Sequence, residues 1–179
     1  MNICKRIRQK LKSRLGFTLA EMLMAVLILL MVSSVVAGGV PVAANAYYKV
    51  VDAANAQVLL STTVTKLRRE LAFASACKLK SGSTEIENYT NGEIRKVMTL
   101  VSKDKDGIQL DWIEGGSQHS EPLVRIAATT KGLYATFEKI TYKDGFFTVE
   151  DLKVQKDGNE NPLASVQKLK IRAIAMRDS

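Results

Sequence analysis

Residues 15–46 read LGFTLAEMLMAVLILLMVSSVVAGGVPVAANA, and this stretch determines how the chain is organised. From Phe17 onward Glu21 is its only charged residue. The 23 residues from Met22 to Ala44 carry no charge, a length sufficient for a helix to cross the hydrocarbon core of a bilayer. The stretch therefore predicts one membrane-spanning helix near the N-terminus.

A basic segment precedes the apolar stretch. Residues 1–16 contain six lysines or arginines and no acid, whereas residues 17–179 contain 20 bases and 18 acids. Positive charge beside a membrane span stays on the cytoplasmic side. We therefore expect a cytoplasmic leader and an extracytoplasmic segment 47–179. The net charge of +8 describes the leader, and it does not argue for nucleic-acid binding by the rest of the chain.

Helical periodicity continues after the apolar stretch. Five apolar residues recur at spacings of four, three, four and three: Leu60, Val64, Leu67, Leu71 and Ala74. This spacing places them on one stripe of a helix, with Thr62 and Arg69 on the opposite side. The sequence thus predicts one long helix, bent near Gly38–Pro41, with an apolar half followed by an amphipathic half over residues 47–77.

The remaining residues, 78–179, have the patterns of β-strands. Apolar and polar residues alternate in Ile108–Trp112, as on a half-buried strand. An Asp-Gly turn separates Ala135–Tyr142 from Phe146–Val154, so these two segments are expected to form an antiparallel pair. The predicted fold class is α+β, a long bent N-terminal helix packed on a C-terminal antiparallel β-sheet.

The predicted organisation has four segments. They are a basic leader (1–16), a transmembrane and assembly helix (17–46), the amphipathic half of the helix (47–77) and the antiparallel sheet domain (78–179), with 47–179 forming the globular body.

The segment Leu15-Gly16-Phe17-Thr18-Leu19-Ala20-Glu21-Met22-Leu23 resembles the processing signal of type IV prepilins and of the pseudopilins of type II secretion and competence systems. That signal is a basic leader ending in Gly, then Phe-Thr-Leu, then Glu as the fifth mature residue, then an apolar helix. All of these elements occur within residues 1–46. The resemblance implies the pilin fold and cleavage by a prepilin peptidase between Gly16 and Phe17.

The resemblance also implies roles for two mature residues. The new amine of Phe17 would be methylated, and Glu21 would pair with the Phe17 amine of a neighbouring subunit. A carboxylate inside an apolar helix is costly in lipid and is usually functional, which supports this role for Glu21. Gly16 has no side chain, so a narrow peptidase cleft can close on its backbone.

The implied function is that of a structural subunit, a minor pilin or pseudopilin, of a type IV pilus-like filament that serves secretion, DNA uptake, adhesion or motility. The implied partners are the prepilin peptidase, other pilin or pseudopilin subunits in a homo- or hetero-filament, the membrane and the inner-membrane assembly machinery. The chain would be a single-pass cell-membrane protein that reaches the cell surface when assembled. Many major pilins have a paired cysteine in the C-terminal part, and its absence here favours a minor subunit.

Three other interpretations of the N-terminus stay open. Residues 17–46 are a plain signal anchor if Glu21 is there by chance. They are an ordinary secretory signal if Ala44-Asn45-Ala46 is the cleavage site, although the apolar region is longer than usual and carries a charge. The third interpretation is a monomeric, membrane-tethered extracellular binding module, which has no need of Glu21.

No catalytic constellation is found in the sequence, so neither an enzyme nor a cofactor is predicted. His119 lies alone in a polar stretch and is expected in a solvated loop, and Cys77 is expected to pack at the end of the helix. The segment Asp157–Asn161 offers oxygen ligands suited to calcium but lacks the EF-hand pattern, so a plain turn is expected and no metal site is assigned.

Overall fold

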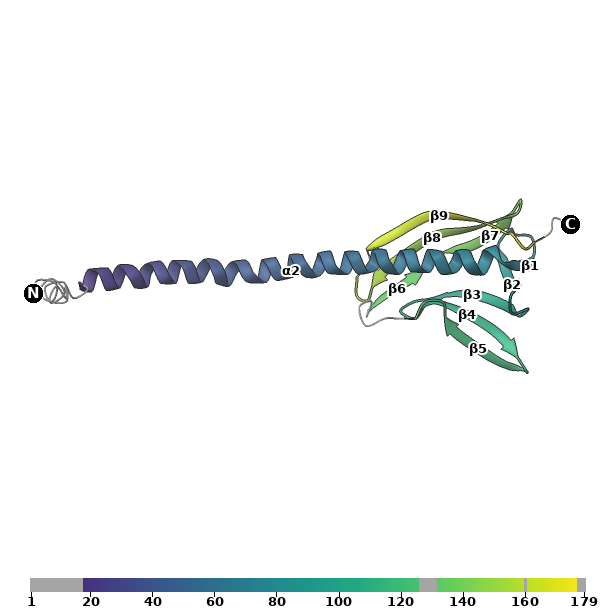
Figure 1. Cartoon of the computed structure of the whole chain (residues 1–179), viewed down its shortest axis with the longest axis horizontal. Helices are drawn as coiled ribbons and strands as arrows, with labels where there is room; N and C mark the ends of the chain where they lie inside the picture. The colour runs from purple at the N-terminus through teal and green to yellow at the C-terminus, as the bar shows by residue number, and fades with distance from the viewer. Residues whose placement is uncertain (1–17, 126–131, 160, 177–179) are drawn as a thin grey trace, which may run out of the picture. The chain divides into compact units, whose positions relative to one another are not determined.

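The computed structural model describes residues 18–125, 132–159 and 161–176 (Figure 1). A long helix, α2 (Leu19–Ala72), is followed by β-strands that pair antiparallel throughout. This confirms the predicted α+β class. The chain forms two units, residues 1–48 and residues 49–179. We call residues 18–48 the stem and residues 49–179 the body.

The strands of the body form two sheets. They are β1 (Ala74–Leu79), β2 (Ile86–Asn91), β3 (Val97–Lys103), β4 (Gly107–Glu114), β5 (Ser117–Pro122), β6 (Leu133–Thr136), β7 (Lys139–Lys143), β8 (Phe146–Lys156) and β9 (Ala164–Arg172). The first sheet has the order β1-β2-β3-β4-β5. In the second sheet the long strand β8 pairs with β6 and β7 on one side and with β9 on the other. The sheets meet where the Tyr142 N–H donates to the Thr84 carbonyl at 2.8 Å.

The helix ends earlier than the predicted segment 47–77. Its last residue is Ala72, and Cys77 lies on β1 instead of at the helix terminus. The sheet domain therefore begins at Ala74 and not at residue 78. The helical spacing of apolar residues does not reveal that the helix ends at Ala72. Ala74 fits this spacing and is buried, but it is buried as a strand residue.

Carbonyl groups at the end of α2 accept hydrogen bonds from distant parts of the chain. The Ala72 carbonyl accepts from the Ile174 N–H at 2.8 Å, and the Phe73 carbonyl accepts from the Gly92 N–H at 3.0 Å. A helix terminus needs such partners for its last carbonyls. Gly92 is required for this contact, because a Cβ on it would lie 2.4 Å from the Phe73 oxygen.

The predicted strand Ala135–Tyr142 is two strands, β6 and β7, and this part of the prediction was wrong. Between them the Phe137 N–H donates to Ser102 Oγ at 3.2 Å, so the backbone leaves the ladder to bond β3. Opposite the break, Asp151 of β8 has a φ of 50°, which is uncommon inside a strand. The predicted hairpin between β7 and β8 is confirmed, since Asp144 and Gly145 have φ values of 52° and 78°.

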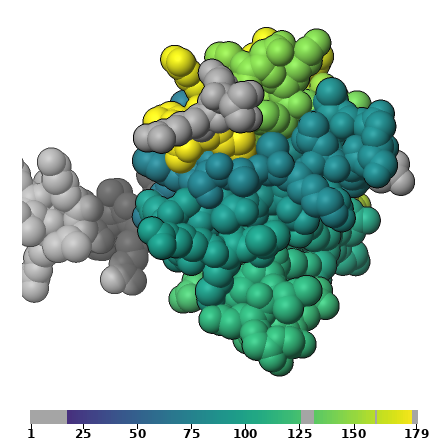
Figure 2. Space-filling model, turned by 90° about the vertical axis from the view of Figure 1, so that its right-hand side faces the viewer, coloured from purple at the N-terminus to yellow at the C-terminus, as the bar shows by residue number. Residues whose placement is uncertain are grey.

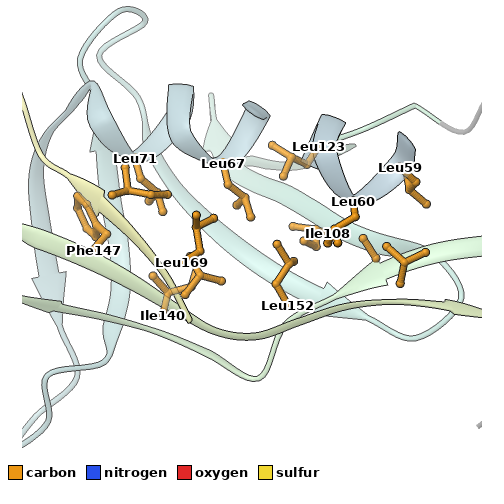
Figure 3. Close-up of a cluster of buried hydrophobic side chains, with 14 of the residues drawn as sticks. Leu59, Leu60, Leu67, Leu71, Ile108, Leu123, Ile140, Phe147, Leu152 and Leu169 are labelled. Atoms are coloured by element: carbon orange, nitrogen blue, oxygen red, sulfur yellow. The ribbon is translucent and has the colours of Figure 1, made fainter. Parts of the chain in front are cut away.

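The core of the body lies between α2 and the two sheets. Figure 3 shows Leu60, Leu67 and Leu71 directed from the helix toward strand residues, which include Phe147 and Leu169. The predicted stripe is thus confirmed at its centre. The buried stripe is also wider than predicted, because it includes Ala56, Leu59 and Thr63. The Thr63 hydroxyl is buried without cost to hydrogen bonding, since it donates to the Leu59 carbonyl at 2.7 Å.

Replacing Leu67 with alanine is expected to lower the free energy of unfolding of the body by about 2–5 kcal/mol, the range for large-to-small changes at fully buried sites. Leu67 has no exposed surface, so the substitution leaves a cavity between the helix and the sheets. Val58→Ala is the matched control, because Val58 lies on the same helix and is 61% exposed. Urea unfolding of the full chain in detergent micelles, followed by Trp112 fluorescence, measures the difference. Equal effects of the two substitutions would contradict the packing described here.

Candidate functional site

The stem exposes apolar side chains on all sides of its helix. Ile28, Leu29 and Leu30 are 59%, 65% and 62% exposed, although consecutive residues lie about 100° apart around the helix axis. Within the described residues, α2 is long and apolar enough to span a membrane, and none of its most apolar window is buried by the chain itself. A single copy of the chain therefore leaves this surface to be covered by lipid or by other helices.

The N-terminus of α2 is capped by reciprocal hydrogen bonds between Thr18 and Glu21. Glu21 Oε2 accepts from the Thr18 N–H at 2.9 Å and from the Thr18 hydroxyl at 3.0 Å. In return, the Glu21 N–H donates to Thr18 Oγ1 at 3.3 Å. This arrangement is a capping box, with Thr18 as the N-cap residue and Glu21 three positions later. It satisfies two backbone N–H groups that the helix cannot satisfy by itself.

The capping box gives Glu21 a local structural role that the sequence interpretation missed. The pattern Thr-x-x-Glu before an apolar run is a signal for a helix start, and it is present in the sequence. The same two residues also belong to the segment that resembles the processing signal, so the two patterns coincide in the sequence. In a single chain the carboxylate of Glu21 is thus engaged by Thr18, and any partner from a second chain has to share it or replace that engagement.

The predicted processing residues Gly16 and Phe17 lie outside the described residues. Of the predicted site, the structure describes Glu21 and brings it together with Thr18. Cleavage between Gly16 and Phe17, methylation of Phe17 and pairing of its amine with Glu21 therefore stay predictions.

The middle of the stem carries the residues that were expected to bend the helix. The helix continues through Gly38, Gly39 and Pro41, although Pro41 has no N–H to donate to the carbonyl four residues earlier. A Cβ placed on either glycine would meet no described atom within 4 Å. Nothing within the described chain therefore requires glycine there, whereas a helix from another molecule could approach closely at these positions.

His119 was expected in a solvated loop. It is exposed, as expected, but it lies on a strand and not in a loop. It lies on β5 opposite Trp112 of β4, and the two rings stack with centroids 5.4 Å apart and planes 15° apart. Lys96 Nζ lies 5.7 Å from the Trp112 ring centroid. A polar stretch without apolar alternation thus forms a strand, because the preceding hairpin turn and the Trp112 contact hold it.

The loop after β8 contains the oxygen-rich residues that were considered for calcium. Asp157 pairs with Lys105 at 3.0 Å, and Asn159 Oδ1 accepts from the Asn161 N–H at 3.2 Å. These contacts describe a turn. In the part of the chain that the structure describes, no group of three or more His, Cys, Asp or Glu residues is placed to hold a metal ion.

A comparison of the chain with models of protein families, with curated proteins and with solved structures finds no match. The function is therefore argued from the N-terminal motif and from the geometry of the stem and the body.

Proposed function

We propose that the chain is a minor pilin or pseudopilin, a structural subunit of a type IV pilus-like filament. A prepilin peptidase cuts it between Gly16 and Phe17, and the stem then packs against the stems of neighbouring subunits. The observation that carries the proposal is the coincidence of a basic leader, a Gly-Phe junction and Glu21 at the start of a long apolar helix.

The exposed apolar surface of the stem supports a role in assembly. A helix of this kind is stable in lipid, and it can also be covered by other helices of the same kind. Glu21 is the one charged residue of α2 between Leu19 and Tyr48. In a filament the positive amine of Phe17 from a neighbour compensates this charge, whereas in a monomeric anchor the charge has only the Thr18 contacts.

The body supports the proposal by having a core of its own. Its apolar side chains are buried between the second half of α2 and two antiparallel sheets. A domain built in this way presents strands and loops outside the membrane while the stem provides the contacts between subunits. Cleavage of the leader would remove six positive charges from the end that must leave the cytoplasmic face.

The mature N-terminus tests the proposal directly. When the chain is expressed with a prepilin peptidase, intact-mass and N-terminal analysis of the membrane form are expected to show a chain that begins at Phe17 and carries a methyl group on its amine. Expression without the peptidase is the control and should leave Met1 or Asn2 at the terminus. A mature chain that begins at Tyr47 would identify an ordinary secretory signal. A chain that stays uncut in the presence of the peptidase would identify a plain anchor.

A further inference from the structure

Three outer edges of the two sheets pair with nothing else in the described chain, those of β1, β5 and β9, whereas along the fourth edge β7 forms a bridge with Glu85 and the Phe137 N–H after β6 donates to Ser102. Free edges promote association between chains, and proteins usually protect them with bulges, lysines or prolines. The three edges differ in this respect, so each is considered in terms of the groups that it presents.

The edges of β1 and β9 are both protected. The pairing of β1 with β2 shifts register at two places, between Ala74 and Ala76 and between Lys78 and Leu79. Directly after β9, the Ala173 N–H donates to the Gly145 carbonyl at 2.9 Å, so the backbone of Ala173 faces the neighbouring strand. Backbone direction alternates along an antiparallel strand, so the N–H and carbonyl groups of Arg172, and of every second residue before it, face away from the sheet. These outward positions carry the cations Arg172, Lys170 and Lys168.

The edge of β5 has neither device. All six of its residues are exposed, and it pairs with β4 in an unbroken register from Ser117 to Pro122. It carries no lysine or arginine. Figure 2 shows the β4–β5 hairpin as the protrusion at the lower side of the body. Only Pro122, at the last position of β5, limits pairing on this side.

The inward hydrogen bonds of β5 identify the backbone groups that face outward. The Leu123 N–H donates to the Ile108 carbonyl at 2.9 Å, so in an antiparallel ladder Glu121, His119 and Ser117 also face β4. The N–H and carbonyl groups of Gln118 and Ser120 therefore point away from the sheet. These four groups can form hydrogen bonds with a strand that is added at this edge.

We propose that β5 pairs antiparallel with β5 of a second copy of this chain, in a twofold contact centred on His119. Gln118 of each copy then exchanges two hydrogen bonds with Ser120 of the other, which gives four bonds between the chains. The two five-stranded sheets become one continuous sheet. This contact goes beyond the proposed function, because a twofold contact closes on two copies and does not extend a filament.

The groups on β5 select this register. Centring the pair on Ser120 would require an N–H from Pro122, which has none, and centring it on Gln118 would draw the turn residue Gly116 into the ladder. Centring on His119 places Glu121 opposite Ser117 of the second copy, so no acid faces an acid. It also places the two His119 rings side by side, each already stacked on its own Trp112.

Disulfide trapping tests the register. In the full chain with Cys4→Ser and Cys77→Ser, His119→Cys is expected to give at least about tenfold more disulfide-linked dimer than Ser117→Cys under mild oxidation in detergent micelles. Residues opposite each other in a non-hydrogen-bonded pair have Cα atoms about 4.5 Å apart, within the range of a disulfide. The two Ser117 positions are offset by four residues, or about 13 Å along the strands, which is too far. Association through the stems would affect both variants equally, so the ratio reports on β5 alone.

Two further substitutions test the outward backbone and side chains. Ser120→Pro removes an outward N–H, and Gln118→Lys copies the protection found on β9. Either change, combined with His119→Cys, is expected to reduce the trapped dimer at least about tenfold, while the thermal unfolding of the body identifies any loss of folding. If Ser120→Pro lowers the unfolding temperature of the body, the pairing is judged from the amount of dimer trapped with Gln118→Lys. Equal trapping at positions 117 and 119, no trapping at position 119, or trapping that Gln118→Lys leaves unchanged would overturn the pairing.

Discussion

Replacing Gly16 with valine is expected to leave the chain uncut and to abolish its entry into filaments. Valine places a branched side chain next to the scissile bond, where the proposed peptidase has to close on the backbone. A displacement of about 1 Å at a reacting centre can cost a factor of about 100 in rate, so the cleaved form should fall below detection in a short pulse. The uncut chain keeps six positive charges ahead of the stem and has no free amine at Phe17.

Two matched substitutions show whether this effect belongs to position 16. Gly16→Ala adds one methyl group and should be cut partially, whereas Ser13→Val adds the same branched side chain within the leader and should be cut as the parent is. The measurement is a pulse-chase comparison of full-length and shortened chains in cells that contain the peptidase. If Gly16→Val is shortened as rapidly as the parent chain, the site of cleavage assigned here is wrong.

The helix and its core stripe were predictable because both depend on local sequence. The spacing of Leu60, Leu67 and Leu71 can be read without knowledge of the rest of the chain, and these residues are buried in the structure. The length of the uncharged run also predicts a spanning helix from composition alone. Such features do not depend on which distant residue becomes a neighbour.

The places where the prediction failed depend on distant partners. The end of α2 at Ala72 is fixed by the Ile174 N–H, about a hundred positions later in the chain. The break between β6 and β7 depends on a hydrogen bond from Phe137 to Ser102 of β3. Neither contact can be recognised from the residues next to Ala72 or Phe137. A prediction from local periodicity therefore extends both the helix and the strand too far.

The strand β5 and the capping box were missed for a different reason. The sequence SQHSEP has no apolar alternation, and its strand conformation comes from the turn at Gly115 and Gly116, whose φ values are 59° and 83°. The capping box, by contrast, was readable as Thr18 followed by Glu21. The observed role of Glu21 as a cap and its proposed role as a partner for an amine therefore have to be separated by experiment.

Replacing Glu21 with glutamine is expected to reduce filament assembly at least about tenfold, which corresponds to about 1.4 kcal/mol in an assembly equilibrium. Glutamine serves in a capping box as glutamate does, so the start of α2 and the cleavage of the leader should stay as in the parent. What it removes is the negative charge that the Phe17 amine of a neighbouring subunit would meet. The effect should therefore appear in the filament fraction and not in the amount of cleaved subunit.

Thr18→Ala is the matched counterpart, because it removes the capping hydroxyl and leaves the charge of Glu21 in place. If Glu21 acts through the amine of a neighbour, this variant should assemble to nearly the parental level, whereas Glu21→Ala, which removes both roles, should fail as Glu21→Gln does. Glu21→Asp should be intermediate, since the charge remains and the reach is shorter. Each variant is expressed with its native partners, and cleaved subunit, crosslinked dimer and sheared filament are measured separately. If instead Thr18→Ala fails and Glu21→Gln assembles, the role of Glu21 is confined to the helix cap, and the pairing between subunits proposed here is wrong.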